Sequence, residues 1–214
     1  MKSLKILLPT MLIILCLAGM ASATSVGDSW AYCLRAPGVT GVTAGDMNSW
    51  FTFTGAVGNS SAALATSLGV PANEYGLYIS SNVPVVGVRT GTYSVALPVN
   101  GNYKVSVAWG ATTSAKTNVK HVVTYNGGTS TSLLDQTLAG NKNVWMSLGT
   151  FHFVTTSNAQ VKLTNDNQST SGSLYLGAVK FEVTGIDPVP EPSSLLALGT
   201  GLIGMVGFLR RRRA

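Results

Sequence analysis

The apolar residues in the interior of this chain recur at every second position rather than at helical spacing. The clearest stretch alternates Tyr103, Val105, Val107 and Trp109 with small or polar residues. Because successive side chains of a strand point to opposite faces, this period predicts strands with one buried face. The same reasoning predicts strands in residues 50–54, 77–79, 93–97, 119–125, 133–138, 148–153, 161–163 and 179–183.

Turn signals separate these strands. Asn126-Gly127-Gly128 follows the strand that ends at Tyr125, which predicts a hairpin into the next strand. Only the stretch from Ser60 to Leu68 has the alanine and leucine content that predicts a short helix or turn. The interior as a whole predicts an all-β fold, and we expect one antiparallel jelly-roll β-sandwich over residues 24–184.

The first 23 residues have the organisation of a secretory signal peptide. Lys2 and Lys5 precede an apolar stretch, and Ala21 and Ala23 flank a serine in the pattern that signal peptidase cuts. We therefore expect a signal helix in residues 1–23 that is removed during export. The mature chain would keep one cysteine, Cys33, so its stability must come from packing rather than from an internal disulfide.

The last 30 residues predict a membrane tail. A Pro-rich linker in residues 185–194 contains Pro190, Glu191 and Pro192. Residues 195–209 predict a short transmembrane helix, because about 15 residues at about 1.5 Å rise cover roughly 23 Å of a hydrocarbon core about 30 Å thick. The positive-inside rule places residues 210–214 in the cytoplasm, since this segment contains Arg210, Arg211, Arg212 and Arg213.

The charge of the chain lies mainly in these ends. The sequence has 14 lysines and arginines, of which two lysines of the leader and four arginines of the tail make six, so eight remain against eight acidic residues. The exported body is therefore close to neutral. It also lacks a basic patch with interleaved aromatic residues, which excludes nucleic-acid binding by charge.

Residues Val189 to Ala214 resemble the sorting tail of the PEP-CTERM class of exported bacterial proteins. The resemblance rests on a Pro-Glu-Pro element, a short apolar helix and an arginine cluster, in this order and behind a signal peptide. It implies that an exosortase-type protease of the inner membrane removes the tail after transient anchoring. It also implies a final place at the cell surface or in an extracellular biofilm matrix of exopolysaccharide. The alternative is an ordinary anchor that is never cut, and the short span favours removal.

A second resemblance covers about Gly101 to Val183. The motifs are Gly101-x-Tyr103-x-Val105, Asp135-Gln136, Trp145-x-x-Leu148-Gly149-x-Phe151 and Ala178-Val179-Lys180-Phe181. They are similar to those of the golvesin C-terminal-like domain, which implies a jelly roll similar to carbohydrate-binding domains. Many members have an acidic residue two positions before the valine of Ala-Val, where this chain has Gly177.

Three aromatic residues are candidates for ligand binding. Trp109, Trp145 and Tyr125 lie near the ends of predicted strands, where an aromatic ring can stack on a sugar. The alternative is that these rings close the open ends of the sandwich, and for the two tryptophans we favour this structural role.

Neither a metal centre nor an active site can be assembled from the sequence. His121 and His152 lie on separate strands, and we expect His152 to face solvent. Asp46, Asp135 and Asp166 could supply oxygen ligands to a structural calcium ion, but they lack the spacing of a calcium-binding loop. Gly27-Asp28-Ser29 resembles the first block of GDS-type esterases, but no late Asp-x-x-His accompanies it, and we expect Ser29 to be a loop residue.

We therefore expect a noncatalytic exported surface or matrix protein with a carbohydrate-binding-like module and no cofactor. Its partners would be signal peptidase, an exosortase-type protease and a polysaccharide. The alternative is a purely structural matrix protein that associates with itself and binds no specific glycan. A hydrolase is the third class, and the absence of an acid/base pair disfavours it.

Overall fold

The computed structural model describes residues 29–33, 48–54, 58–70, 75–79, 89–112, 114–164 and 172–188. The signal helix, the Pro-Glu-Pro element, the predicted transmembrane helix and the arginine cluster all lie outside these residues. Within the described ranges no helix has both the length and the apolar character needed to cross a bilayer.

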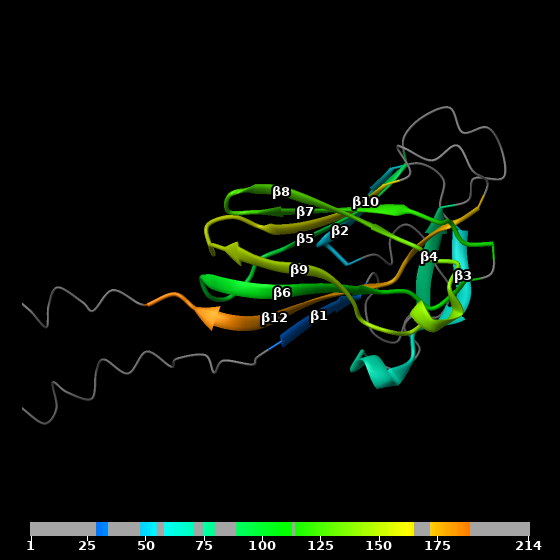
Figure 1. Cartoon of the computed structure of the whole chain (residues 1–214), viewed down its shortest axis with the longest axis horizontal. Coiled ribbons are helices and arrows are strands. Elements are labelled where there is room, and N and C mark those ends of the chain that lie inside the picture. The colour runs from blue at the N-terminus through cyan, green and yellow to red at the C-terminus, as the bar shows by residue number, and fades with distance from the viewer. Residues whose placement is uncertain are drawn as a thin grey trace, which may run out of the picture.

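Two antiparallel sheets lie face to face and form a β-sandwich (Figure 1). The four-stranded sheet has the order β1 (Ser29–Cys33), β12 (Ala178–Ile186), β6 (Gly101–Ala108) and β9 (Met146–Phe153). The five-stranded sheet has the order β2 (Phe51–Thr54), β5 (Thr90–Val95), β10 (Ala159–Thr164), β7 (Val119–Tyr125) and β8 (Gly128–Leu134). The period of two therefore predicted the all-β class correctly, because the inner face of each large sheet is buried.

A smaller sheet closes one end of the sandwich. It contains β11 (Leu174–Leu176), β4 (Tyr75–Ile79) and β3 (Gly58–Ala63), at the right in Figure 1. The prediction of a helix or turn from Ser60 to Leu68 is wrong for its first half, since β3 runs to Ala63. Only a 3-10 turn, η2 (Thr66–Leu68), follows, because pairing with β4 overrides the helical propensity of the alanines. A second 3-10 turn, η3 (Ala139–Asn141), follows β8.

Several element boundaries differ from the predictions. β8 begins at Gly128, directly after the hairpin turn, and ends at Leu134, although the apolar residues pointed to residues 133–138. β12 continues to Ile186, two residues into the range expected to be linker. Ser29 is the first residue of β1 rather than a loop residue. Strands β1, β3 and β11 lack a strong alternating pattern and were not predicted as strands.

The core fills the space between the two large sheets. Tyr103, Phe153 and Phe181 make edge-to-face contacts at ring distances of 5.9 and 5.7 Å. Tyr93 faces them from β5 and donates its hydroxyl hydrogen to the carbonyl oxygen of Gly177 at 2.7 Å. All four aromatic side chains are buried, in agreement with the core predicted from the alternation.

A second, smaller cluster lies outside the main core. Leu64, Leu68 and Val70 from the segment after β3 pack on Ala108 of β6 and Ala178 of β12. These two alanines alternate with the inward-facing residues of their strands, so the cluster covers the outer face of the four-stranded sheet.

We expect Trp109→Ala to lower the free energy of unfolding by about 3 to 5 kcal/mol, because the indole is 1% exposed and its loss leaves a cavity in the main core. Urea denaturation measures the change. Thr129→Ala, at an exposed position of β8, is the control and should shift stability by less than about 0.5 kcal/mol. Equal stability of the two variants would contradict the structural role of Trp109.

Candidate functional site: the pocket at the turn end

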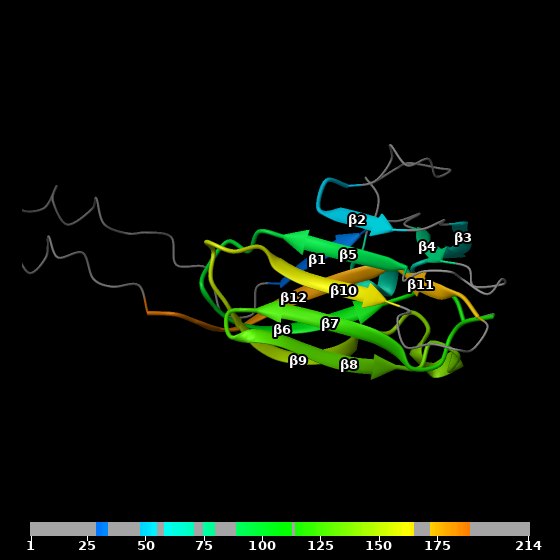
Figure 2. The same cartoon turned by 90° about the horizontal axis from the view of Figure 1, so that it is seen from above.

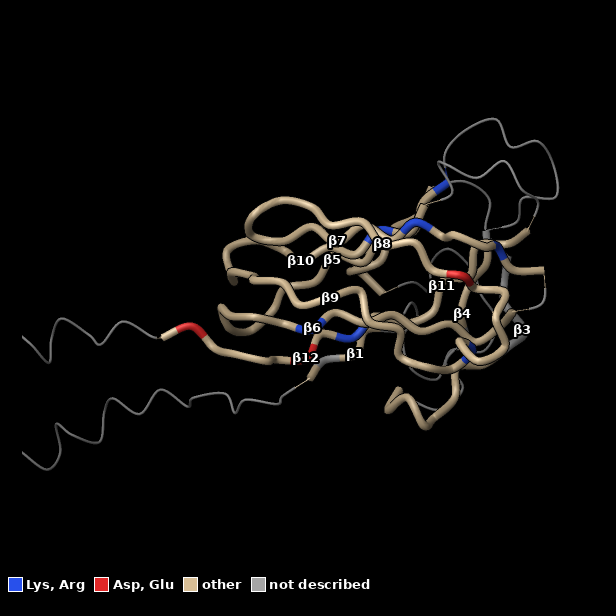
Figure 3. The backbone as a smooth tube through the Cα atoms, viewed as in Figure 1, with Lys and Arg blue, Asp and Glu red and all other residues tan. Residues whose placement is uncertain are grey.

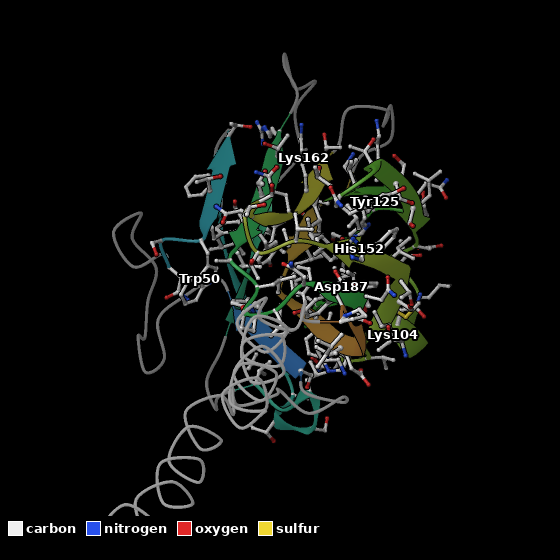
Figure 4. All side chains as sticks on the ribbon, turned by 90° about the vertical axis from the view of Figure 1, so that its left-hand side faces the viewer. Trp50, Lys104, Tyr125, His152, Lys162 and Asp187 are labelled. Atoms are coloured by element: carbon white, nitrogen blue, oxygen red, sulfur yellow. The ribbon has the colours of Figure 1, made fainter. Side chains whose placement is uncertain are left out.

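A pocket of about 200 Å³ opens at the end of the sandwich where the hairpin turns lie. We call this end the turn end; it is on the left in Figure 1 and faces the viewer in Figure 4. One wall comes from the end of β7 and its turn, with Thr124, Tyr125 and Asn126. The opposite wall comes from the end of β9 and the loop after it, with Phe153, Ser157 and Asn158.

The walls offer both apolar and hydrogen-bonding groups. Phe153 is buried, and Tyr125 is half-buried with its ring 5.0 Å from that of Phe151. Asn126, Ser157 and Asn158 are exposed, so their polar side chains are accessible to a ligand. The combination of an aromatic ring with amide and hydroxyl groups is the composition that a small-molecule pocket needs for both contact area and orientation.

A chain of polar contacts joins Asn126 in the pocket wall to the end of β12. The imidazole of His152 places Nε2 2.9 Å from a carboxylate oxygen of Asp187 and Nδ1 3.5 Å from the Asn126 amide nitrogen. If Nε2–H donates to Asp187, Nδ1 is left to accept from Asn126, which fixes the orientation of the amide. Figure 4 shows Tyr125, His152 and Asp187 in succession across this end. The expectation that His152 faces solvent is incomplete, because the side chain is 35% exposed and bonded to a carboxylate.

Backbone contacts join the remaining turns at this end. The backbone carbonyl oxygen of Asn100 accepts a hydrogen bond from the backbone N–H of Asp187 at 3.1 Å. The side-chain oxygen of Asn100 accepts one from the backbone N–H of Thr155 at 2.6 Å. The backbone N–H of Asn126 donates to the backbone carbonyl oxygen of His152 at 3.0 Å. The loops around the pocket are therefore connected to one another and to the end of β12, from which the chain continues toward the Pro-Glu-Pro element.

The turn end has little charge. In Figure 3 the described turns at this end are tan except for one red segment just after β12, whereas Lys104, Lys180 and Glu182 belong to β6 and β12. The residues that line the pocket are all uncharged. Their chemistry fits a neutral, hydroxyl-rich ligand better than a charged one.

The two predicted tryptophans lie away from this pocket. Trp109 is buried, so its ring has no exposed face on which a sugar could stack. Trp145 packs against the smaller cluster, donates from Nε1 to the carbonyl oxygen of Leu68 at 3.1 Å, and lies 5.3 Å below the Lys180 ammonium. Of the three aromatic candidates, only Tyr125 lines the pocket.

The Asp135-Gln136 motif has a structural explanation. Asp135 accepts hydrogen bonds from the amide and the hydroxyl of Thr137 at 2.8 and 2.6 Å, so its carboxylate closes a turn. The Gln136 side chain is fully buried; it donates to the Tyr175 carbonyl oxygen and accepts from the Tyr175 amide, both at 2.9 Å. It thus pairs with β11 as a strand would.

The other polar candidates lie apart from one another in the described part of the chain. His121 is fully buried, and burial lowers its pKa to about 4, so the imidazole is neutral at neutral pH. No group of three or more histidine, cysteine or acidic side chains lies together among the described residues. Asp46 and Asp166 lie outside those residues, so the structural calcium ion stays a prediction.

Gly177 stands where the resemblance implies an acidic residue, and its surroundings leave no room for a side chain. The glycine lies between β11 and β12, where the chain changes sheets, and a side chain would collide with the carbonyl oxygen of Ala108. Its own carbonyl oxygen receives the Tyr93 hydroxyl. This copy therefore uses the position for close packing between strands.

A family model for the Golvesin C-terminal domain matches residues 60–183, and a model for the PEP-CTERM protein-sorting motif matches residues 188–213. The chain belongs to the Golvesin C-terminal domain family. The match confirms the resemblance seen from Gly101 onward and extends it back to β3. The sorting motif also indicates that this Golvesin C-terminal domain is exported.

A xanthan lyase from Bacillus sp. (strain GL1) is 33% identical over 100 residues, which are 46% of this chain and 10% of the lyase. The solved structure of Paenibacillus xanthan lyase matches with a TM-score of 0.56 and 24% identity, over 75% of this chain and 13% of the lyase. The chain thus spans about a tenth of the length of these proteins. An exo-β-1,3-galactanase from Phanerochaete chrysosporium matches more weakly, with a TM-score of 0.43 and 16% identity, over 73% of this chain and 30% of that chain.

Most of the pocket could not be found in the sequence. Ser157 and Asn158 look like ordinary loop residues, and the partners His152 and Asp187 are 35 positions apart. The turn signal Asn126-Gly127 was the only local sign that this end holds exposed amides.

We expect Gln136→Leu to lower the free energy of unfolding by about 2 to 4 kcal/mol, because both amide hydrogen bonds to Tyr175 are lost in a fully buried place. Urea denaturation gives the value. Leu138→Ala, two residues further and 53% exposed, is the control with little expected change. A Gln136→Leu variant as stable as the unsubstituted protein would contradict this structural role of Gln136.

Proposed function

We propose that this Golvesin C-terminal domain is a noncatalytic module that binds polysaccharide through the pocket at the turn end. The observation that supports the proposal most directly is the pocket's lining: one tyrosine ring beside two exposed asparagines and a serine, with no charged side chain. Sugars present apolar ring faces and many hydroxyl groups, and such a lining offers a partner to each.

The size of the pocket limits what it accommodates. About 200 Å³ is less than the roughly 300 to 1,000 Å³ of pockets that enclose drug-sized ligands. It fits one sugar unit, such as a chain end or a side branch, better than several. The partial match to a xanthan lyase makes xanthan the first polysaccharide to test.

The crossing of successive strands between the two sheets agrees with the jelly roll that we infer for this domain.

The tail supplies the second half of the proposal. We infer that residues 195–209 hold the precursor in the inner membrane and that an exosortase-type protease then removes them, which leaves the domain at the surface or in the matrix. The matched sorting motif supports this route. Pro188 is the last described residue and the first of the matched sorting motif, and it follows Asp187 directly, so the motif starts at the turn end.

We expect Asn158→Ala to weaken polysaccharide binding about tenfold, because one hydrogen-bonding side chain of the pocket is lost while the fold is kept. Tyr125→Phe should weaken it less, since only the hydroxyl is removed and the contact with Phe151 remains. Calorimetric titration with a hit from a polysaccharide array, with xanthan included, measures both. Asn102→Ala, exposed on β6, is the control. Binding that all three variants leave unchanged would place the ligand elsewhere.

We expect Glu191→Ala to block removal of the tail, because the Pro-Glu-Pro element is the feature that distinguishes this tail from an ordinary anchor. Mass spectrometry of the protein from cells that have an exosortase-type protease shows whether the tail is present. Ser194→Ala is the matched control and should be processed normally. A tail that is removed from both variants would contradict the sorting proposal.

A further inference from the structure

β8 forms one edge of the five-stranded sheet. It pairs with β7 through seven consecutive residue pairs, from Val119 with Leu134 to Tyr125 with Gly128. No described strand pairs with its other side. Figure 2 shows β2, β5, β10, β7 and β8 side by side in this order, with β8 outermost.

This edge lacks the features that usually prevent strands from pairing with other molecules. Edge strands of monomeric proteins are commonly interrupted by a bulge or carry a charged residue or a proline. β8 has the sequence Gly-Thr-Ser-Thr-Ser-Leu-Leu, with none of these residues and no shift in its register. By contrast, β9, at the edge of the other large sheet, has a register shift opposite Val105 and Ser106.

The hairpin determines which backbone groups face the open edge. Tyr125 and Gly128 flank a two-residue turn and so form a hydrogen-bonded pair, and bonded and non-bonded pairs alternate from there. Thr129, Thr131 and Leu133 belong to the non-bonded pairs, so their N–H and C=O groups point outward. The side chains of these three residues are exposed, Leu133 to 53%.

We propose that β8 pairs antiparallel with β8 of a second copy of this chain, about a two-fold axis at Thr131. Full overlap of the two strands places Thr131 opposite its own copy and Thr129 opposite Leu133. All three outward-facing residues then find partners, which no shifted register achieves. The charge pattern favours a second copy as the occupant, because an uncharged strand meets no like charge when it pairs with itself.

The symmetry has a consequence for when pairing takes place. A two-fold axis normal to the sheet reverses the strand direction, so the turn ends of the two copies point in opposite directions. β12 ends at the turn end in both copies, as Figure 1 shows for one. Two precursors anchored in one bilayer would have their turn ends pointing toward the same membrane, which the antiparallel pairing does not allow. Pairing would therefore follow removal of the tail. This consequence, unlike the pairing itself, rests on the proposed insertion of the tail.

Sedimentation equilibrium of the full chain in density-matched detergent tests the pairing. We expect a monomer–dimer equilibrium that Thr131→Lys weakens by about tenfold or more, because two lysines then face each other across the axis. Thr52→Lys is the matched control: it lies exposed on β2, the opposite edge strand of the same sheet, and should leave the dimer unchanged. Circular dichroism checks that both variants remain folded.

Three results would overturn the proposal: a monomer at every concentration, a dimer that Thr131→Lys does not weaken, or equal effects of both lysines. The second result would assign association to another surface, such as the apolar tail. Thr131→Pro gives an independent test, since it removes an outward N–H without a charge and should weaken the dimer similarly. Polysaccharide binding is tested by other variants, Asn158→Ala and Tyr125→Phe in the pocket. The binding proposal and the pairing proposal can therefore fail independently.

Discussion

The packing of two sheets across one aromatic layer is the interaction on which the rest of this structure depends. Phe181 of β12 contacts Phe153 of β9, which contacts Tyr103 of β6, and Tyr93 of β5 faces them from the other sheet. Burial of apolar area is the main favourable term in folding, and this domain has no internal disulfide to supplement it. The Tyr93 hydroxyl also bonds to Gly177, which connects the core to the crossing between β11 and β12.

The turn end uses a different chemistry because the core stops there. Beyond Phe153 the strands end in exposed asparagines, and their loops are held by hydrogen bonds among Asn100, Asn126, His152 and Asp187. A rigid sandwich that presents loops from several strands is a common platform for binding sites. Here the same network also fixes the end of β12, so the proposed ligand site and the start of the sorting tail are adjacent.

Local sequence patterns predicted the strands whose faces differ in polarity. The segment from Tyr103 to Trp109 alternates, and β6 lies there. The patterns failed where neither face is apolar: β3 contains Gly-Asn-Ser-Ser-Ala-Ala, and most of β8 is serine and threonine. Such strands exist because a neighbouring strand supplies hydrogen bonds: β3 pairs with β4, and β8 pairs with β7. Local sequence also could not assign Trp109 and Trp145. A tryptophan near a strand end has the same sequence surroundings whether it packs in the core or contacts a ligand.

The sequence by itself determined the all-β class, the neutral body, the hairpin after Tyr125 and the family, because each follows from local periodicity, composition or motif spacing. Only the tertiary structure decided which residues come together: His152 with Asp187, Gln136 with Tyr175, and Tyr125 with Asn158 around one pocket. It also decided that β8 is an edge strand. The physical reason is that sheet order and loop proximity are set by burial of whole faces against each other, a property that no single segment contains.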